Sequence, residues 1–160
     1  MRLKLLAVAR EPKNDPLGDA AADYLKRAQG VAPSLGLKGP ESRFLAPAKG
    51  NDPAKEAELL RAAISGDAVL LDERGAMMSS PDIAKLVAKK RDAGVPELAF
   101  CIGGADGFDK AFREEVKGRG GTLLAFGKAV WPHALCRVML AEQIYRSLAI
   151  LSNHPYHRGG

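Results

Sequence analysis

The run Leu98-Ala99-Phe100-Cys101-Ile102-Gly103-Gly104-Ala105-Asp106-Gly107 predicts a buried strand that ends in a glycine loop. Its first half is entirely apolar, which is typical of a strand covered on both faces. The loop places backbone N–H groups at the carboxyl edge of a sheet, where open α/β folds bind ligands and glycine permits close approach. The spacing differs from the dinucleotide fingerprint G-x-G-x-x-G and lies far from the first strand, which disfavours an ordinary Rossmann enzyme. Taken alone, the motif fits either a ligand loop or a tight turn that needs glycine dihedrals.

Strands alternate with helices on both sides of this run. Apolar segments predict four further strands, at residues 3–9, 43–45, 68–71 and 123–126. Helical spacing and capping residues predict helices at residues 16–28, 53–64, 80–94, 110–117 and 133–151. Ser80 is the expected cap of its helix, and residues 31–40 are expected to form a loop. The alternation predicts one α/β domain over residues 1–160, with a mostly parallel sheet flanked by helices on both faces.

The composition is that of a globular chain. Hydrophobic residues make up 46% and charged residues 27% of the 160 residues, which argues against disorder. No run approaches the ~20 apolar residues of a membrane span, and the opening segment is too short and too interrupted for a signal peptide. Cys101 and Cys136 lie in apolar patterns without the neighbours of a zinc site or a redox pair. We therefore expect a cytoplasmic protein with no membrane partner and no metal.

The last predicted helix, residues 133–151, is apolar on two sides. At about 100° per residue, one broad apolar face is formed by Ala134, Val138, Ala141, Ile144, Tyr145, Leu148 and Leu151. Leu135, Met139 and Ile150 fall on the opposite side. Such a helix is either buried all round or also packs against a second subunit. Because a chain this small rarely buries a helix completely, we expect a homodimer.

Arg137 falls in the middle of the main apolar face of that helix. A permanently charged guanidinium is costly to bury unless a partner or a ligand satisfies it, so the position indicates a functional residue. The alternative is a surface arginine whose charged end reaches solvent. Glu142 and Arg146 have the spacing of a plain helix-surface ion pair.

The segment His154-Pro155-Tyr156-His157-Arg158 gathers side chains that suit RNA. It offers ring faces for base stacking, imidazoles for hydrogen bonding and a guanidinium for phosphate. All the histidines and the only tryptophan, Trp131, lie at or after residue 131, and the net charge of +5 favours an anionic partner if basic residues gather around a site. The alternative is an ordinary terminal segment in which Tyr156 packs onto the core. The tail histidines lack the carboxylates or cysteines that would accompany them in a metal site.

Several motifs along the chain resemble one known family. They are residues 1–8 (MRLKLLAV), 23–27 (DYLKR), 71–75 (LDERG), 100–107 (FCIGGADG), 131–133 (WPH), 137–146 (RVMLAEQIYR) and 154–158 (HPYHR). Together they are similar to the large-subunit ribosomal RNA pseudouridine methyltransferase family, a minimal branch of the SPOUT superfamily. The likeness covers nearly the whole chain, and it is weakest around Arg10 and at residues 31–40.

The resemblance implies a fold and a cofactor. The implied fold is a parallel sheet whose C-terminal segment threads into a trefoil knot, a topology that general rules of chain connection would reject. The implied cofactor is S-adenosylmethionine, as methyl donor. By motif position, the residues expected to hold it are Leu71, Gly103, Gly104, Phe126, Gly127, Lys128, Ala129, Val130 and Trp131.

The resemblance also implies a reaction and partners. The implied reaction is methylation of N3 of a pseudouridine in 23S rRNA of the assembled ribosome, by a homodimer that completes the active site across its interface. Because the sulfonium already activates the methyl group, the protein has to align it with the base nitrogen and help to remove the N3 proton. We expect His154, Tyr156, His157 and Arg158 to position the nucleotide, and Arg137 to contact RNA phosphate or orient the tail. The proton acceptor is a tail histidine or water.

Two other functions fit the same sequence. One is a knotted methyltransferase that acts on tRNA, although the absence of an added RNA-binding domain favours a large preformed substrate such as the ribosome. The other is a ribosome-binding factor that keeps the fold and catalyses nothing. The intact glycine loop and the intact tail speak against this second alternative.

Overall fold

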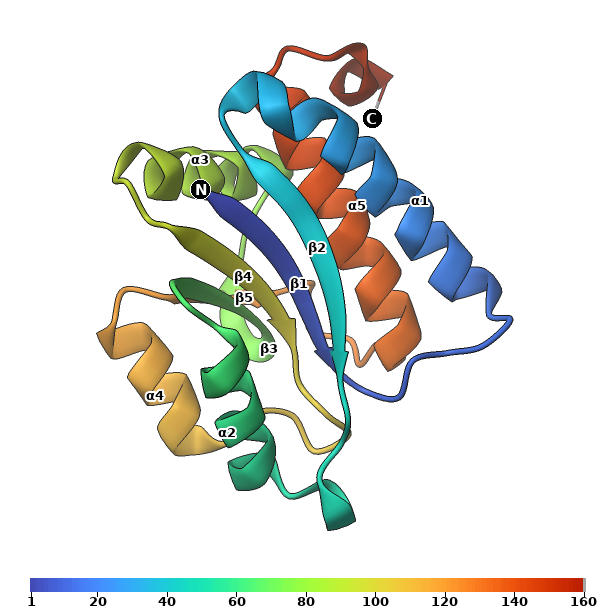
Figure 1. Cartoon of the computed structure of the whole chain (residues 1–160), viewed down its shortest axis with the longest axis vertical. Helices are drawn as coiled ribbons and strands as arrows, with labels where there is room; N and C mark the ends of the chain where they lie inside the picture. The colour runs from blue at the N-terminus through green and yellow to red at the C-terminus, as the bar shows by residue number, and fades with distance from the viewer. Residues whose placement is uncertain (160) are drawn as a thin grey trace.

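Five parallel strands form the sheet of the computed structural model, in the order β2-β1-β4-β3-β5 (Figure 1). The strands are β1 (Arg2–Val8), β2 (Lys38–Leu45), β3 (Asp67–Met77), β4 (Glu97–Ile102) and β5 (Thr122–Ala125). The structure describes the backbone of residues 1–159 and the side chains of residues 1–157. Every residue of β4 is buried, as its apolar run predicted. The predicted α/β architecture with a parallel sheet is confirmed.

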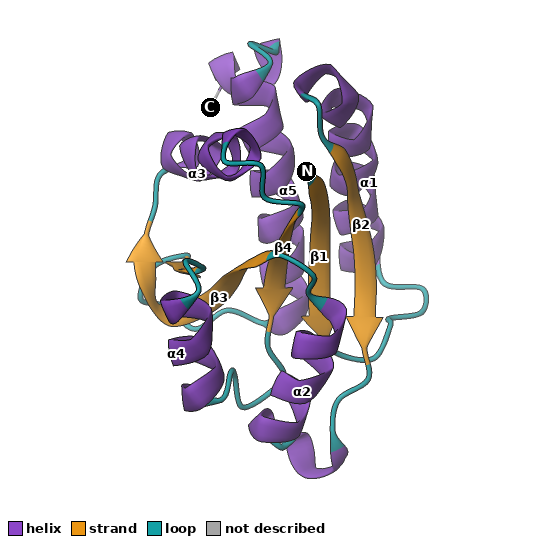
Figure 2. Ribbon diagram, turned by 60° about the vertical axis from the view of Figure 1, so that its left-hand side comes forward, coloured by secondary structure: helices purple, strands orange, loops and turns teal. Residues whose placement is uncertain are grey.

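Helices cover both faces of the sheet (Figure 2). One face packs against α1 (Pro16–Val31), α3 (Ser80–Asp92) and α5 (His133–Leu151), and the other against α2 (Pro53–Ala63) and α4 (Lys110–Gly118). Three short 3-10 helices complete the chain: η1 (Ala32–Leu35), η2 (Lys49–Asn51) and η3 (Pro155–Gly159). Successive strand residues enter opposite cores: Leu5 packs toward α1 and α5, whereas Leu6 packs toward α2 and α4. None of the described helices has the length and apolar content needed to cross a membrane.

Two local predictions from sequence need correction. The cap of α3 is Ser79, not Ser80, because the Ser79 hydroxyl accepts a hydrogen bond from the Asp82 N–H at 3.3 Å. Residues 38–40, expected within a loop, begin strand β2 instead. Gly39 and Pro40 signalled a strand break, but β2 lies at the edge of the sheet, where a residue without an N–H donor is tolerated.

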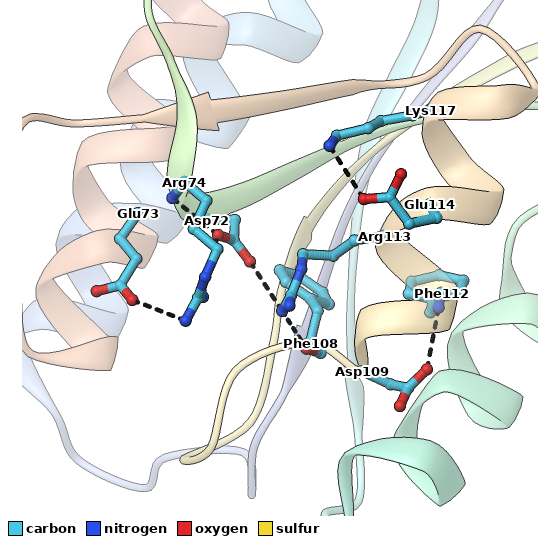
Figure 3. Close-up of polar contacts among 9 residues, drawn as sticks. All are labelled: Asp72, Glu73, Arg74, Phe108, Asp109, Phe112, Arg113, Glu114 and Lys117. Atoms are coloured by element: carbon cyan, nitrogen blue, oxygen red, sulfur yellow. Dashed lines mark hydrogen bonds and ion pairs between the residues drawn. The ribbon is translucent and has the colours of Figure 1, made fainter.

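Strand β3 is longer than its apolar run predicted, because it continues past a bulge. Residues 67–71 pair with β4, and the pairing with β5 shifts register between Leu71 and Ala76. Gly75 lies at this shift, and a Cβ there would be 2.5 Å from the carbonyl carbon of Leu123. The backbones therefore approach each other in a way that only glycine allows. Asp72, Glu73 and Arg74 lie in this bulge, and Figure 3 shows their polar contacts.

The connections that follow β1 and β4 leave in opposite directions. β1 leads into α1 on one face of the sheet, whereas β4 leads into α4 on the other face. These two strands are neighbours in the sheet. A crevice therefore opens between their carboxyl ends, and in open α/β sheets such a switch point is the usual place for a ligand.

Glu97, at the start of β4, is a buried carboxylate at the opposite, amino edge of the sheet. The Lys4 ammonium lies 2.8 Å from one carboxylate oxygen, and the Ser65 N–H donates to the other at 2.9 Å. Burial alone would raise the pKa of Glu97, but these contacts outweigh it and hold the pKa below its ordinary value. The ionised form of Glu97 therefore stabilises the folded state.

The substitution Glu97→Gln is expected to lower the free energy of unfolding by about 1–3 kcal/mol near neutral pH, since Lys4 then loses its counter-charge. Because the folded-state pKa is depressed, this contribution is present above the unfolded-state pKa of about 4.3 and is lost as the pH falls through the folded-state value. Urea unfolding of both proteins across the acid range measures the difference, which should shrink as the pH falls. A difference that stays constant with pH would contradict the role given to the charge.

Candidate functional site

A cavity of about 460 Å³ opens at the carboxyl ends of β3, β4 and β5. We call it the β3–β5 cavity. It is lined by residues 71–74, by residues 102–108 of the loop after β4, by residues 125–127 and 129–131 after β5, and by His133 and Cys136 of α5. Its size lies within the roughly 300–1,000 Å³ range of small-molecule sites. Three loops that are far apart in sequence thus meet around one hollow.

The glycine loop after β4 is both a tight turn and a wall of this cavity. The Gly107 N–H donates to the Gly104 carbonyl at 3.0 Å, and Gly107 adopts a positive φ of 74°. A Cβ on Gly104 would lie 2.3 Å from a carboxylate oxygen of Glu56, a residue only 2% exposed. The tight-turn interpretation of the motif is therefore confirmed, and the same glycines line the cavity.

The segment between β5 and α5 is tied to the rest of the cavity by two contacts. The Trp131 indole N–H donates to the Phe126 carbonyl at 3.2 Å. His133 Nε2 lies 2.9 Å from the Gly103 carbonyl, so this nitrogen carries the proton in that contact. Val130 stands out from the segment with 90% of its side chain exposed, unusual for an apolar residue beside a cavity.

A charged wall closes the β3 side of the cavity (Figure 3). Asp72 is buried between two arginines, 3.5 Å from Arg113 and 3.6 Å from Arg74. Arg113 also donates to the Phe108 carbonyl, and thereby joins the bulge of β3 to the loop that precedes α4. The Arg74 N–H closes the turn by donating to Asp72 at 2.9 Å. The arginines neutralise the buried carboxylate, and the exposed Glu73 and Arg74 carry both signs of charge at the rim.

The structure brings nearly all the predicted cofactor residues together. Eight of them line the β3–β5 cavity: Leu71, Gly103, Gly104, Phe126, Gly127, Ala129, Val130 and Trp131. Lys128 lies in the same segment but is not part of the lining. Sequence reasoning missed Asp72, Arg74, Asp106, His133 and Cys136, which also line it. Two sequence features could have identified some of them: the charged run after the third strand, which contains Asp72 and Arg74, and the Trp-Pro-His motif, which contains His133.

The predicted catalytic tail packs on the C-terminal part of α5. The Tyr156 hydroxyl donates to Glu142 at 3.0 Å, and its ring lies 4.6 Å from that of Tyr145. Burial raises the pKa of Tyr156, and its hydrogen bonds with Tyr24 and Glu142 add to the rise. The Tyr156 N–H donates to Nδ1 of the exposed His154 at 3.2 Å. The tail is therefore anchored to the body of the protein by Tyr156.

The ion pair predicted as a plain surface feature belongs to this anchor. Arg146 lies 2.8 Å from Glu142, and the two side chains are only 20% and 18% exposed. The Arg146 guanidinium stacks 4.9 Å from the Tyr156 ring centre. Nδ1 of His157 is buried without a hydrogen-bond partner among the described residues. The side chain of Arg158 lies outside the described part of the structure.

The tail and the β3–β5 cavity lie at opposite ends of α5. His133 and Cys136 at the start of the helix line the cavity, whereas the tail follows its end. A helix of 19 residues spans about 28 Å. The tail and the C-terminus lie far from the carboxyl ends of the strands (Figure 1). Within one chain, the structure does not bring the predicted catalytic tail to the predicted cofactor residues.

Arg137 is buried, with only 8% of its surface exposed, so the surface alternative for this residue is wrong. Its Nη2 donates to the Ser42 hydroxyl at 3.0 Å, and its guanidinium stacks 4.5 Å from the Phe44 ring centre. Nε is buried without an acceptor among the described residues. Burial lowers the pKa of Arg137, and the charges of Glu11 and Asp15 oppose the shift. The residue lines a second cavity, of about 360 Å³, beside the end of β1.

Comparison with known proteins assigns the family. A family model described as a predicted SPOUT methyltransferase matches residues 1–157. The chain belongs to the SPOUT methyltransferase family. Members of this family transfer a methyl group from S-adenosylmethionine, so the chain is a methyltransferase and S-adenosylmethionine is its donor.

Relatives in this family match over their full length. A protein of Dinoroseobacter shibae named ribosomal RNA large subunit methyltransferase H is 50% identical over 99% of both chains. Proteins with the same name from Roseobacter denitrificans and Cereibacter sphaeroides are 45% and 44% identical, again over 99% of both chains. A solved methyltransferase structure from Legionella pneumophila, in complex with S-adenosylmethionine, covers 91% of this chain and 53% of its own, at 16% identity and a TM-score of 0.37. That last likeness is too distant to carry residue positions across.

Proposed function

We propose that the chain methylates N3 of a pseudouridine in 23S rRNA, within the assembled ribosome. The assignment of rRNA as the substrate rests on similarity, over 99% of both chains, to proteins named ribosomal RNA large subunit methyltransferase H. The target nitrogen and the assembled ribosome follow from the family resemblance of the sequence motifs. With the ribosome as substrate, the reaction takes place where ribosomes are, in the cytoplasm.

The β3–β5 cavity holds the methyl donor. The donor combines an adenosine part with a zwitterionic amino-acid part, and the cavity offers bare glycine backbone beside a rim with both signs of charge. Gly103, Gly104 and Gly127 let the donor approach the chain closely, and Leu71, Phe126 and residues 129–131 enclose it. When bound, the donor supplies a methyl group already activated by the sulfonium. The chain has to hold this group in line with the acceptor nitrogen and exclude water.

The tail acts on the site of a second copy of the chain. The tail leaves α5 at the end remote from its own β3–β5 cavity, and Tyr156 holds it at Glu142, about 14 Å along the helix axis from His133. A two-fold homodimer places the tail of one protomer beside the cavity of the other. Leu135, Met139 and Ile150 are only half-buried in one chain, and this second apolar side of α5 supplies a contact surface. Val130 adds an exposed apolar group at the cavity.

In this arrangement the tail positions the nucleotide. His154 is exposed and offers an imidazole and a ring face, and Tyr156 fixes the course of the tail through Glu142. His157 and Arg158 follow Tyr156 within the short helix η3 and are the remaining tail residues that we expect to position the nucleotide. The N3 proton passes to a tail histidine or to water.

The fold we propose for residues 1–160 is one domain with a C-terminal trefoil knot. The support is local: the segment after β5 lies against the loop after β4 and the bulge of β3, because all three line one cavity. The chain then continues into α5, which packs on the sheet face that α1 and α3 also cover. Threading of this segment beneath the β3 loop would rigidify the donor site.

The deciding experiment supplies labelled S-adenosylmethionine together with assembled ribosomes, isolated subunits, free rRNA or tRNA. Label is expected in 23S rRNA of assembled ribosomes, and nucleoside analysis is expected to place it on N3 of a pseudouridine. Label on tRNA would instead favour a knotted tRNA methyltransferase. Ribosome binding without label would favour a non-catalytic ribosome-binding factor.

S-adenosylmethionine is expected to raise the melting temperature of the isolated protein by roughly 5–10 °C. At about 100 times its dissociation constant, a native-state ligand stabilises by about 2.7 kcal/mol, and 1 kcal/mol corresponds to about 2–4 °C for a chain of this size. A melting curve with increasing donor measures the shift, with ATP as the control for the adenosine part alone. No shift at saturating donor would exclude the β3–β5 cavity as a ready-formed donor site.

A further inference from the structure

The second cavity, of about 360 Å³, lies at the topological switch point of the sheet. We call it the switch-point cavity. It is bounded by the end of β1 and the start of α1, by residues that follow β2, and by Ala134 and Arg137 at the start of α5. It shares Ala105, of the loop after β4, and His133 with the β3–β5 cavity. The two cavities are therefore adjacent, with Ala105 and His133 between them.

The position of this cavity is typical of a ligand-binding site. Open α/β sheets bind ligands where the connections of neighbouring strands diverge, and here that point is between β1 and β4. The donor site lies to one side of it, over β3 and β5. A methyl acceptor has to lie beside the donor, since the methyl group moves directly from sulfur to nitrogen. The neighbouring switch-point cavity meets this requirement.

The apolar lining of the cavity suits a base. Most of it is apolar and comes from Val8, Ala9, Pro12, Phe44, Pro47 and Ala134. Enzymes that act on a base within structured RNA or DNA take it out of the stack into a snug pocket with apolar walls and few polar contacts. Asp15 also lines the cavity, but its carboxylate already accepts hydrogen bonds from the N–H groups of Leu17 and Gly18. Arg10 lines the cavity as well, so its charged groups are two arginines and one carboxylate, and the apolar walls are the feature that favours a base.

Arg137 is a buried polar group of this cavity, and its bonding among the described residues is incomplete. Ser42 and Phe44 hold one end and one face of its guanidinium, which fixes the plane of the group. Its Nε has no acceptor among the described residues. A buried guanidinium in this state is costly unless a ligand provides an acceptor. The carbonyl oxygens beside N3 of a uracil-type ring are such acceptors.

We propose that the switch-point cavity receives the target base, flipped out of the RNA, and that Arg137 donates a hydrogen bond to a carbonyl oxygen of that base. This inference rests on the proposed function. In the reaction the N3–H bond breaks and its proton leaves to a tail histidine or to water. The N3 electron pair then forms the bond to the methyl carbon as the carbon–sulfur bond breaks, and the donor leaves as a neutral thioether. Negative charge that develops on the ring spreads to its carbonyl oxygens, where Arg137 stabilises it.

Two variants test the cavity and one controls for them. Ala134→Phe fills the cavity from an exposed position that does not line the donor site. Arg137→Gln removes the charge but keeps most of the volume. Ala62→Phe makes the same change as the first variant at an exposed position of α2, on the opposite face of the sheet. For each protein we would measure donor affinity, sedimentation mass, and the single-turnover rate of ribosome methylation against pH.

Ala134→Phe and Arg137→Gln are expected to slow methylation by about 100-fold, with donor affinity and sedimentation mass unchanged. Ala62→Phe is expected to match the unmodified protein. In Arg137→Gln the rising limb of the pH–rate profile should also move up by about one pH unit, because the ring nitrogen is harder to deprotonate without the guanidinium. A purely structural role for Arg137 would not move this limb.

Three outcomes would overturn the inference and leave the proposed function standing. One is methylation by both variants within about threefold of the unmodified protein. Another is a weaker apparent ribosome affinity in Arg137→Gln with an unchanged maximal rate and pH profile, which is the signature of a phosphate contact. The third is loss of activity in Ala134→Phe alone. By contrast, an unmodified protein that labels no ribosome would refute the proposed function itself.

Discussion

The substitution Gly104→Val is expected to weaken S-adenosylmethionine binding by about 100-fold, which corresponds to about 2.7 kcal/mol, and to remove methylation at ordinary donor concentrations. A Cβ at this position would lie 2.3 Å from a carboxylate oxygen of Glu56 and 2.9 Å from its carboxyl carbon. Glu56 cannot simply turn away, because it is buried and its other oxygen accepts the Ala48 N–H at 3.2 Å. The loop itself must therefore move, and its backbone lines the donor site. Isothermal titration with the donor measures the loss.

A second-site change separates this local clash from general damage. Because the clash is with Glu56, the double variant Gly104→Val with Glu56→Ala should recover a large part of the lost affinity. Gly30→Val is the matched control, since a Cβ on Gly30 meets nothing within 4 Å, and it should bind the donor normally. Donor affinity in Gly104→Val within about twofold of the unmodified protein would show that the glycine loop does not shape the site.

The sequence predicted most of the layered architecture because local patterns decide it. The wholly apolar run of β4 had to be covered on both faces, and every one of its residues is buried. The bounds of α5 agree with the prediction, since Pro132 precedes its first residue and its apolar spacing ends at Leu151. The errors at Ser79 and at residues 38–40 concern the end of a helix and an edge strand, where local signals are weakest, and the extension of β3 past its apolar run depends on a bulge.

The site was predicted less completely, because its parts meet through long-range contacts. Glycine after a buried strand pointed to the loop at Gly104, but the charged run after Leu71 gave no prediction of a buried carboxylate. In the structure Asp72 of β3 is buried and lies 3.5 Å from Arg113 of helix α4. In the same way, the helical projection predicted that Arg137 is buried, whereas its partner Ser42 lies 95 residues away in sequence. No periodicity connects such pairs, so only the folded chain identifies them.

The tail shows how composition can identify a site without locating it. Aromatic and basic residues after residue 153 indicated RNA, and the structure anchors them through Tyr156 to Glu142. The tail follows the end of α5, whereas the β3–β5 cavity lies at the start of that helix. A site made of both parts therefore requires a second copy of the chain, which leads to a prediction about mixed dimers.

A dimer made of one Gly104→Val chain and one chain shortened after Asn153 is expected to regain about half of the unmodified activity, although each variant alone is expected to keep less than about 1%. In this mixed dimer the shortened chain provides an intact donor cavity and the Gly104→Val chain provides an intact tail. Co-expression with two different affinity tags isolates the mixed species, and labelled donor with assembled ribosomes measures its activity.

The matched control places both changes in one chain and pairs it with an unmodified chain. If the tail acts on the partner, this dimer is inactive, because the intact cavity faces a missing tail and the intact tail faces a defective cavity. If the tail acts on its own chain, the outcomes are reversed: the control keeps about half of the activity and the first dimer has none. The two mixed dimers have the same composition and the same total number of changes. Their activities therefore report only which protomer's tail serves which protomer's cavity.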